Sequence, residues 1–204
     1  MIYYDTLKKL NVDIFKLTMF YFVMNGYQLD DTREVFYCGK AGSILKRCGL
    51  KSSTVEITAS QRAIRKILGV ESGYKEDKDC AHGRSITEAV NLPVLINAPV
   101  LVIGGNDTNS SRLVFIEIKR QGRKMFVVLD LKIKVVKVFG KRQKSYSIST
   151  AYSKDYASIR EKIEQAIAMQ TVFYYNKSKI SSWLKAGGLG DLQKKIEANA
   201  EFFT

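Results

Sequence analysis

The chain has 204 residues, of which 46% are hydrophobic and 11% aromatic. This composition excludes an intrinsically disordered chain, and the chain is long enough to form one substantial hydrophobic core. Lysine and arginine total 33 against 20 acidic residues, so the formal net charge is +13 at pH 7. Such a charge attracts polyanions by neutralising phosphates and releasing their counterions, so we expect nucleic acid as the first class of partner and an anionic membrane surface as the second.

Several other classes of protein lack support. Cys38, Cys48 and Cys80 have no CxxC spacing and only one histidine in the chain to accompany them, so we expect no metal site, no disulfide framework and a cytoplasmic location. No signal peptide and no membrane-spanning run is evident, so we expect no insertion into a membrane. Of the two classes of polyanion, nucleic acid is the partner that we predict, and a membrane is not. A Walker A or GxGxxG loop is also missing from the sequence, and we predict no cofactor.

Residues 1–75 are predicted to form a mainly helical N-terminal region. In the first helix, apolar side chains recur at intervals of three and four, which collects them on one side. They are Leu7, Leu10, Ile14, Leu17, Tyr21 and Met24. Residues 30–50 are predicted to be a less regular helical stretch, and residues 58–70 a further helix with Thr58 or Ser60 as its N-cap.

The single histidine, His82, lies in the stretch "DCAHGRSITEAVNLP", residues 79–93. Polar residues and two glycines around it predict a loop, and Ser85 with Glu88 forms the capping box of a short helix that should end near Pro93. His82 is therefore expected just ahead of a helix N-terminus. Its structural alternative is an imidazole that is satisfied within the fold.

After Pro99 the periodicity changes to short β-branched segments separated by polar or glycine-containing turns, which is typical of an antiparallel meander. We expect four to five strands, then a helix over 153–170, a strand over 171–175 and a helix over 176–188. The fold class is therefore α+β, with N-terminal helices packed on the meander and further helices at the C-terminus. Residues 76–204 are predicted to be the domain that carries the sheet.

The basic charge is concentrated in the predicted sheet. Between Arg112 and Lys144 eleven lysines and arginines stand against two acids, so this segment carries +9 of the total of +13. Its first strand has an apolar face that includes Val114 and a mixed face that includes Glu117, so one face is expected to meet solvent or ligand. A positive field focused on one region favours nucleic-acid binding, and a solubilising surface is the alternative.

Four stretches in the second half resemble a known family in their order and spacing. They are "HGRSITEAVNLPVLINAPVLVI", "SSRLVFIEIKRQGRKMFVVLDL", "ISTAYSKD" and "VFYYNKSKISSWLKAGGL". Residues 80–190 thereby resemble the C-terminal toxin-like domain of phage Mu protein F-like minor head proteins, a group of the barnase, EndoU, colicin and RelE-like (BECR) nuclease fold. The resemblance implies a metal-independent ribonuclease deployed as a toxin, with RNA and an immunity protein or antitoxin as partners.

Metal-free RNA cleavage needs a base, an acid and a group that stabilises the charged phosphorane. His82 titrates near neutrality and suits either proton transfer, and the resemblance implies that the matching histidine is catalytic. Thr150 and Lys154 offer a hydroxyl and a cation for the phosphate, and Tyr152 a phenol for stacking or proton transfer. These four residues are the predicted catalytic residues.

Four more residues are predicted to bind substrate. Arg84 is a candidate phosphate clamp, as is Arg112, although only Arg84 is retained in the predicted site. Ser149 supplies a hydroxyl, while Tyr175 and Lys177 are suited to stacking on and neutralising a single strand. The structural alternatives are tyrosines that pack a sheet edge and hydroxyls that cap the next helix.

The function predicted from the sequence is thus an RNA-cleaving, toxin-like nuclease of phage or mobile-element origin that works by acid/base transesterification without a metal. One alternative is a basic nucleic-acid-binding protein on the same fold without catalysis. A third is a magnesium-dependent, restriction-like DNA nuclease that uses Asp107, Glu117 and Lys119. Against it, Asp107 lies in a turn sequence where aspartate is common, and Glu-x-Lys arises often by chance on a strand.

Overall fold

The computed structural model describes residues 2–204 apart from 32–33, 51–55, 71–84, 106–110, 121–122, 139 and 153–155. At residues 2–11, 88, 118–120, 123–127, 130, 149–152 and 156 it describes the backbone alone. The helices are α1 (Ile2–Met24), α2 (Ser43–Arg47), α3 (Gln61–Leu68), α4 (Ile86–Ala89), α5 (Leu92–Leu95), α6 (Tyr156–Ala168), α7 (Lys177–Ala186) and α8 (Gln193–Asn199), with a 3-10 turn, η1 (Gly190–Leu192). The strands are β1 (Val35–Lys40), β2 (Glu56–Ser60), β3 (Leu101–Gly104), β4 (Arg112–Arg120), β5 (Arg123–Val138), β6 (Lys141–Tyr152), β7 (Val172–Tyr175) and β8 (Phe202–Phe203).

The strands described here form one mixed sheet in the order β1-β2-β6-β5-β4-β3-β7-β8. Its centre, β3 to β6, is an antiparallel meander, whereas β2 runs parallel to β6 and β8 runs parallel to β7. The α+β class is confirmed. The prediction of a four- to five-stranded antiparallel sheet is wrong in extent, because strands from both ends of the chain widen the meander and make the sheet mixed.

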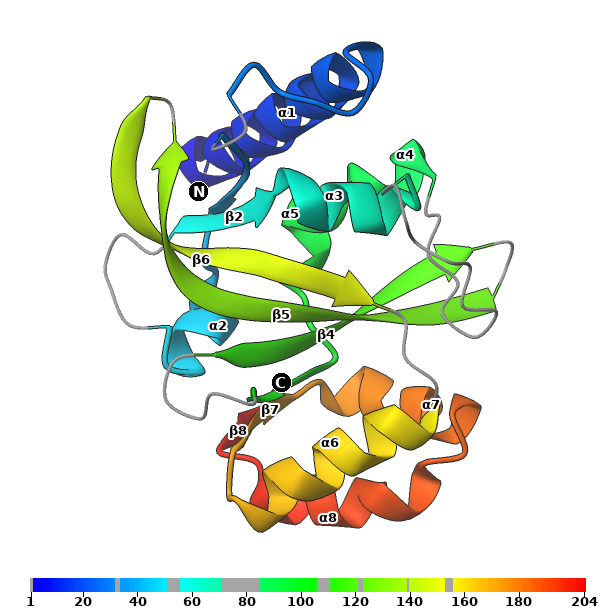
Figure 1. Ribbon diagram of the computed structural model, residues 1–204. Coiled ribbons are helices and arrows are strands. Elements are labelled where there is room, and N and C mark those ends of the chain that lie inside the picture. Colours follow the sequence, from blue (N-terminus) through cyan, green and yellow to red (C-terminus); the bar gives the residue numbers. More distant parts are fainter. Residues whose placement is uncertain are drawn as a thin grey trace.

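Helices cover both faces of the sheet, as Figure 1 shows: α1, α3 and α5 lie on one side, and α6, α7 and α8 on the other. Val114 and Ile116 pack in the core under the first group, while Leu113 and Phe115 pack in the core under the second. Successive residues of β4 point to opposite faces, so this alternation serves two cores. The face of β4 that looked mixed in the sequence is therefore buried at Leu113 and Phe115.

The prediction that residues 30–50 are helical is wrong in its first half. Val35–Lys40 is strand β1, paired antiparallel with β2, and only Ser43–Arg47 is helical. The aromatic and β-branched side chains of "VFYC" fit a pleated surface, and pairing with a distant strand decides between the two structures. Thr58 lies within β2, so Ser60 is the N-cap of α3, its hydroxyl accepting a hydrogen bond from the amide of Ala63.

The first helix buries a different face from the stripe that the spacing selects. Phe15, Met19 and Phe22 are fully buried against the sheet, whereas Leu17 and Met24 from the predicted stripe are 70% and 69% exposed. Helix α1 is thus apolar on two opposite sides. Periodicity marks both stripes as apolar and does not say which one meets the core.

Pro93 does not end the helix that follows the loop. Instead two short helices occur, α4 and α5, and Pro93 lies in the first turn of α5. A first-turn position needs no amide hydrogen, so proline is tolerated there.

The β5–β6 hairpin is long and bends back towards the N-terminal helices, visible at the upper left of Figure 1. Near its tip, Lys137 forms an isolated parallel bridge with Glu34, and its ammonium lies 3.1 Å from the carboxylate of Asp31. Gly140, with φ +79°, lies at the turn in a backbone conformation that favours glycine. The distal half of the hairpin is therefore attached to the segment that precedes β1.

That segment is held by Gln61, whose side chain is only 5% exposed. Its amide oxygen accepts from the backbone amide of Leu29 at 3.1 Å, and its amide nitrogen donates to the carbonyls of Asp31 and Glu34 at 2.8 and 3.2 Å. Gln61→Leu removes these three bonds, although the Asp31 carbonyl keeps the bond that it accepts from the amide of Glu34 at 2.9 Å. We expect a loss of about 2–4 kcal/mol in the free energy of unfolding.

Urea denaturation measures this loss. Gln165→Leu is the matched control, since Gln165 is exposed on α6, and we expect it to change stability by less than about 0.5 kcal/mol. Equal stability of the two variants would show that the bonds of Gln61 contribute nothing net.

Candidate nucleic-acid interface

Only part of the predicted catalytic set falls within the described structure. His82, Arg84 and Lys154 lie outside the described residues, as does Asp107 of the magnesium alternative. Thr150 and Tyr152 are described by their backbone, at the end of β6. The convergence of these residues on one site therefore stays a prediction.

The backbone at the end of β6 is irregular next to Thr150. Thr150 pairs with Asp130 of β5, while Ile148 pairs with Leu131, so Ser149 is an extra residue opposite that step. This is the arrangement of a β-bulge, which changes the direction of a strand and is common beside active sites. The predicted hydroxyl pair Ser149 and Thr150 thus lies at a break in the ladder.

The hydroxyls that precede the bulge are structural. Ser145 and Ser147 are 3% and 1% exposed. The Ser145 hydroxyl lies 3.0 Å from that of Thr58 and 2.9 Å from the carbonyl oxygen of Glu56. The contacts of Ser145 join β6 to β2, and Ser147 is kept from solvent by burial. Among the serines and threonines of β6, the remaining candidates for contact with a substrate are Ser149 and Thr150.

Tyr175 is far from the end of β6. Both lie on one row of paired residues, Tyr152, Val128, Phe115, Leu101 and Tyr175, but four strand spacings apart. At about 4.8 Å per spacing the two backbones are separated by about 19 Å. Tyr175 is therefore remote from Thr150 and Tyr152.

Tyr175 is also packed inside the fold. It is 5% exposed, and its ring stacks on that of Phe203 with the centroids 5.5 Å apart. Burial raises the pKa of its phenol. Tyr174 is fully buried, and its hydroxyl lies 2.6 Å from that of Thr204. This is the packing expected of tyrosines with a structural role, and it leaves Tyr175 little surface on which a base can stack.

Lys177 keeps an exposed position at the start of α7, where its ammonium lies 5.5 Å from the ring centroid of Phe203. Phe203 is itself 55% exposed. The predicted role of Lys177 in neutralising a strand stays a prediction.

Arg112 is not available as a phosphate clamp. It is 8% exposed, its Nε donates to the carbonyl of Cys48 at 2.7 Å, and Nη1 donates to the carbonyl of Ser111 at 2.9 Å. The guanidinium carbon lies 4.3 Å from the ring centroid of Phe173. These contacts commit Arg112 to holding the turn after α2 against the sheet.

The magnesium alternative uses Asp107, Glu117 and Lys119, and of these the structure describes the side chain of Glu117, which is half-buried on β4. Within the described ranges no three His, Cys, Asp or Glu side chains gather as a metal-binding group. Asp107 and the side chain of Lys119 lie outside those ranges, so the alternative stays a prediction.

The clearest charged surface is the distal part of the β5–β6 hairpin, residues 132–144, which we call the basic hairpin. The run 131–152 contains six lysines and arginines and no acid. The six are Lys132, Lys134, Lys137, Lys141, Arg142 and Lys144. Of these, four are exposed: Lys134, Lys141, Arg142 and Lys144. Of the cations in residues 112–144 whose side chains the structure describes, the exposed ones thus lie on one two-stranded ribbon.

Within the basic hairpin like charges are neighbours. Lys137 and Arg142 form a directly opposed cross-strand pair, and Lys144 is opposite Val135. Opposed like charges destabilise a sheet, and Asp31 already relieves part of this repulsion through its ion pair with Lys137, so the exposed Arg142 is the cation of this pair that can meet a bound anion. A shallow hollow of about 500 Å³ lies beside them, lined by Val135, Val136, Lys137, Gly140 and Arg142. Cations around an apolar floor suit a phosphate backbone with attached bases.

These six cations are not among the site residues predicted from the sequence, because they match no motif of the family that the sequence resembles. The signal that identifies them is the absence of acids over 131–152. The absence of acids indicates a single charged surface only once β5 and β6 are known to pair along this whole length.

The fold and this surface define an α+β protein with a mixed sheet and a basic β-ribbon. Residues 74–182 match the family model of the phage MuF C-terminal domain. The match spans just over half of the 204 residues, so the chain belongs to the phage MuF C-terminal domain family. The phage-domain part of the predicted resemblance is confirmed, while its nuclease part stays a prediction.

Comparison with curated proteins gave no match, and comparison with solved structures gave none either. Among the described helices none is long and apolar enough to cross a membrane.

Proposed function

We propose that this protein binds RNA along the basic hairpin and cleaves it without a metal ion, as a toxin-like nuclease. The observation that carries the proposal is the acid-free run 131–152, which places six cations on one ribbon and continues into the strand end with Thr150 and Tyr152. Family membership supports it, since residues 74–182 belong to a phage domain.

The basic hairpin and the end of β6 belong to one strand, which sets the length of the substrate. Lys144 and Thr150 are six residues apart, or about 20 Å at 3.3 Å per residue. Phosphates on one strand of nucleic acid recur at about 3.4 Å per step in a helix and somewhat more when extended. A segment of roughly four to six nucleotides therefore reaches from the lysines to the bulge.

The proposed reaction is transesterification. The 2′-oxygen of the substrate forms a bond to phosphorus, the bond from phosphorus to the 5′-oxygen breaks, and a 2′,3′-cyclic phosphate and a 5′-hydroxyl result. His82 accepts the 2′-hydroxyl proton or donates a proton to the 5′-oxygen, with Tyr152 as the second proton-transfer group. Thr150 and Lys154 donate hydrogen bonds to the charged phosphorane.

Metal independence is the direct test of this chemistry. We expect the purified protein to cleave a mixed single-stranded RNA in the presence of EDTA at the same rate as with magnesium, measured by the appearance of 2′,3′-cyclic phosphate ends. RNA left intact in EDTA and cleaved once magnesium is added contradicts the proposal and favours the restriction-like alternative.

A second candidate function is RNA binding without cleavage, favoured by the fact that the basic hairpin needs no catalytic group to hold a phosphate backbone. The two candidates differ in one outcome. A pure binding protein protects RNA and yields no cyclic phosphate at any pH.

For the catalytic candidate we further propose that the protein acts in the cytoplasm of a bacterial cell and is controlled by an immunity protein or antitoxin.

A further inference from the structure

The outward side of α1 is an apolar surface that the described chain leaves uncovered. We call it the outer stripe. Its exposed fractions are 70% for Leu17, 66% for Phe20, 44% for Tyr21 and 69% for Met24. Scattered exposed apolar residues are ordinary, but four on two turns of one helix form a contiguous patch of the kind that marks an interface. The other side of the same helix is already used, by the core beneath it.

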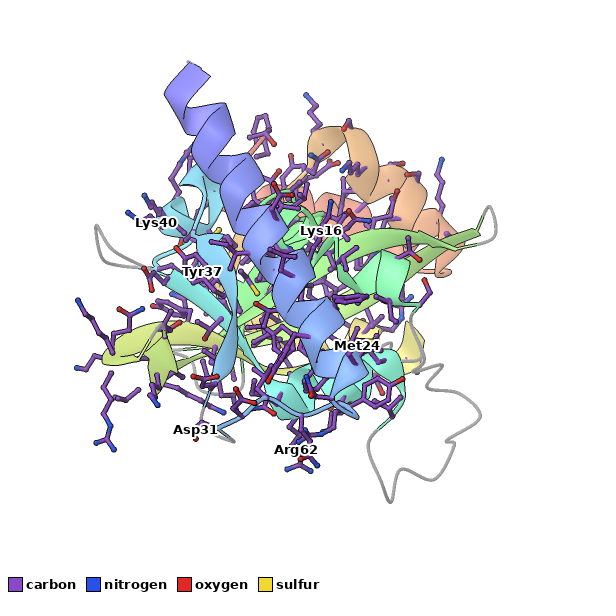
Figure 2. All side chains as sticks on the ribbon, turned by 90° about the horizontal axis from the view of Figure 1, so that it is seen from above. Lys16, Met24, Asp31, Tyr37, Lys40 and Arg62 are labelled. Atoms are coloured by element: carbon purple, nitrogen blue, oxygen red, sulfur yellow. The ribbon has the colours of Figure 1, made fainter. Side chains whose placement is uncertain are left out.

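The two flanks of the outer stripe differ. At about 100° per residue, Ile14 and Tyr21 lie on one flank and Lys16 and Phe20 on the other. The first flank borders a hollow of about 340 Å³, lined in part by Ile14, Leu17, Tyr21 and Tyr37. Figure 2 shows Lys16 on one side of α1 and Tyr37 on the opposite side. One flank is therefore a recess and the other carries a projecting ring and a cation.

The flanks also differ in charge. The Tyr21 hydroxyl donates to the carboxylate of Asp30 at 2.6 Å, which fixes an acid beside the recess. Glu34 lines the same recess, as does Lys137, whose ammonium is already paired with the carboxylate of Asp31 at 3.1 Å. On the opposite flank Lys16 is exposed. A complementary surface must therefore offer a cation opposite Asp30 and an acid opposite Lys16, and must fill the recess with an apolar side chain.

We propose that a second copy of this chain covers the outer stripe, with the two α1 helices parallel about a two-fold axis that runs along them. Such an axis sets each flank against the opposite flank of the partner copy. Phe20 then fills the recess of the other protomer, and Lys16 approaches its Asp30. An antiparallel pair instead sets like flanks together, lysine beside lysine and recess beside recess.

The size and charge of the patch fit this occupant. Four side chains exposed to this degree offer on the order of 400–500 Å² per copy, so a pair buries about 800–1,000 Å², near the lower limit for specific association. The stripe itself carries no charge, so a contact between two copies of +13 each sets no cation of the stripe against its equivalent. Spacings of three and four from Ile14 to Met24 also suit a short parallel helix pair.

Sedimentation equilibrium tests the interface. We expect the wild type to dimerise at about 100 μM and Met24→Glu to be monomeric at that concentration, an increase of at least about tenfold in the dissociation constant. Met169→Glu is the matched control, because Met169 is 61% exposed outside the stripe and should leave the dimer intact. A wild type that stays monomeric overturns the proposal, as does equal dissociation by both variants.

The parallel arrangement has its own test. Lys16→Glu should weaken the dimer roughly three- to tenfold, and adding Asp30→Lys should restore it, because two exposed ion pairs are exchanged for two reversed ones. In a Cys80→Ser background, Leu17→Cys should form a disulfide between protomers, since equivalent residues face each other in a parallel pair. If Leu17→Cys forms no disulfide with itself but forms one with Met24→Cys in a mixture of the two variants, the parallel arrangement is overturned. If no disulfide forms in either experiment, the interface is overturned.

Discussion

Removal of three exposed lysines from the basic hairpin is expected to weaken binding to single-stranded RNA by about 100-fold at 0.1 M salt. The variant combines Lys134→Gln, Lys141→Gln and Lys144→Gln. Each lysine that contacts a phosphate releases about 0.7 of a counterion from a single strand, so three contacts are worth about two decades of affinity at this salt concentration. Glutamine keeps much of the side-chain length and removes the charge.

The measurement is fluorescence anisotropy of a labelled oligonucleotide over a series of salt concentrations. For the variant, the slope of log K against log salt should fall by about 2. The matched control removes three exposed lysines from α7 and α8, Lys185, Lys194 and Lys195, and should change the slope by less than half as much. If the two triple variants behave alike, binding follows net charge and the basic hairpin has no special role.

The second large effect concerns catalysis. We expect His82→Ala to lower the single-turnover rate of RNA cleavage by about 10²–10⁴-fold, which is the usual contribution of a general acid or base, with RNA affinity unchanged within about twofold. A free histidine titrates near pH 6.5, so the rate of the wild type should vary with pH in that region and the rate of the variant should not.

Thr150→Ala and Thr150→Ser separate chemistry from folding in the same assay. Alanine removes the hydroxyl and should lower the rate, while serine keeps it and should restore most of the rate. Growth arrest on expression should follow the same order, lost with His82→Ala and Thr150→Ala and kept with Thr150→Ser. Unchanged cleavage by His82→Ala returns this residue to a structural role and leaves the binding-only candidate as the better description.

The proposed dimer is independent of these outcomes, because its residues lie on α1 and the proposed RNA-binding lysines lie on the hairpin. The two surfaces are nonetheless near one another, since Lys137 lines the same recess as Leu17 and Tyr21. Dimer formation and RNA affinity are best measured on the same variants, with Met24→Glu expected to leave the salt slope of RNA binding per chain unchanged.

Part of the candidate site was predictable from the sequence and part was not. The concentration of cations in residues 112–144 is a sequence property, yet Arg112 is buried under Phe173, and the exposed cations among the described side chains lie on the hairpin. Tyr175 has the residue type expected of a stacking platform, but Phe203, a residue 28 positions later, packs on its ring. Residue type and local charge can be taken directly from the sequence. The solvent exposure of a side chain depends on which distant segments of the chain pack against it.

The sequence by itself determined the α+β class, the antiparallel run from β3 to β6, the C-terminal helices and the membership of a phage domain family. The fold class, the strands and the helices follow from local periodicity and turn chemistry, which act over a few residues. The family membership rests on the order and spacing of four stretches and on the match of residues 74–182 to the family model. Only the tertiary structure decided that Val35–Lys40 is a strand and that the buried side of α1 is the one with Phe15, Met19 and Phe22. The physical reason is the same in both cases: an apolar pattern shows that a surface needs a partner, and only the folded chain supplies one.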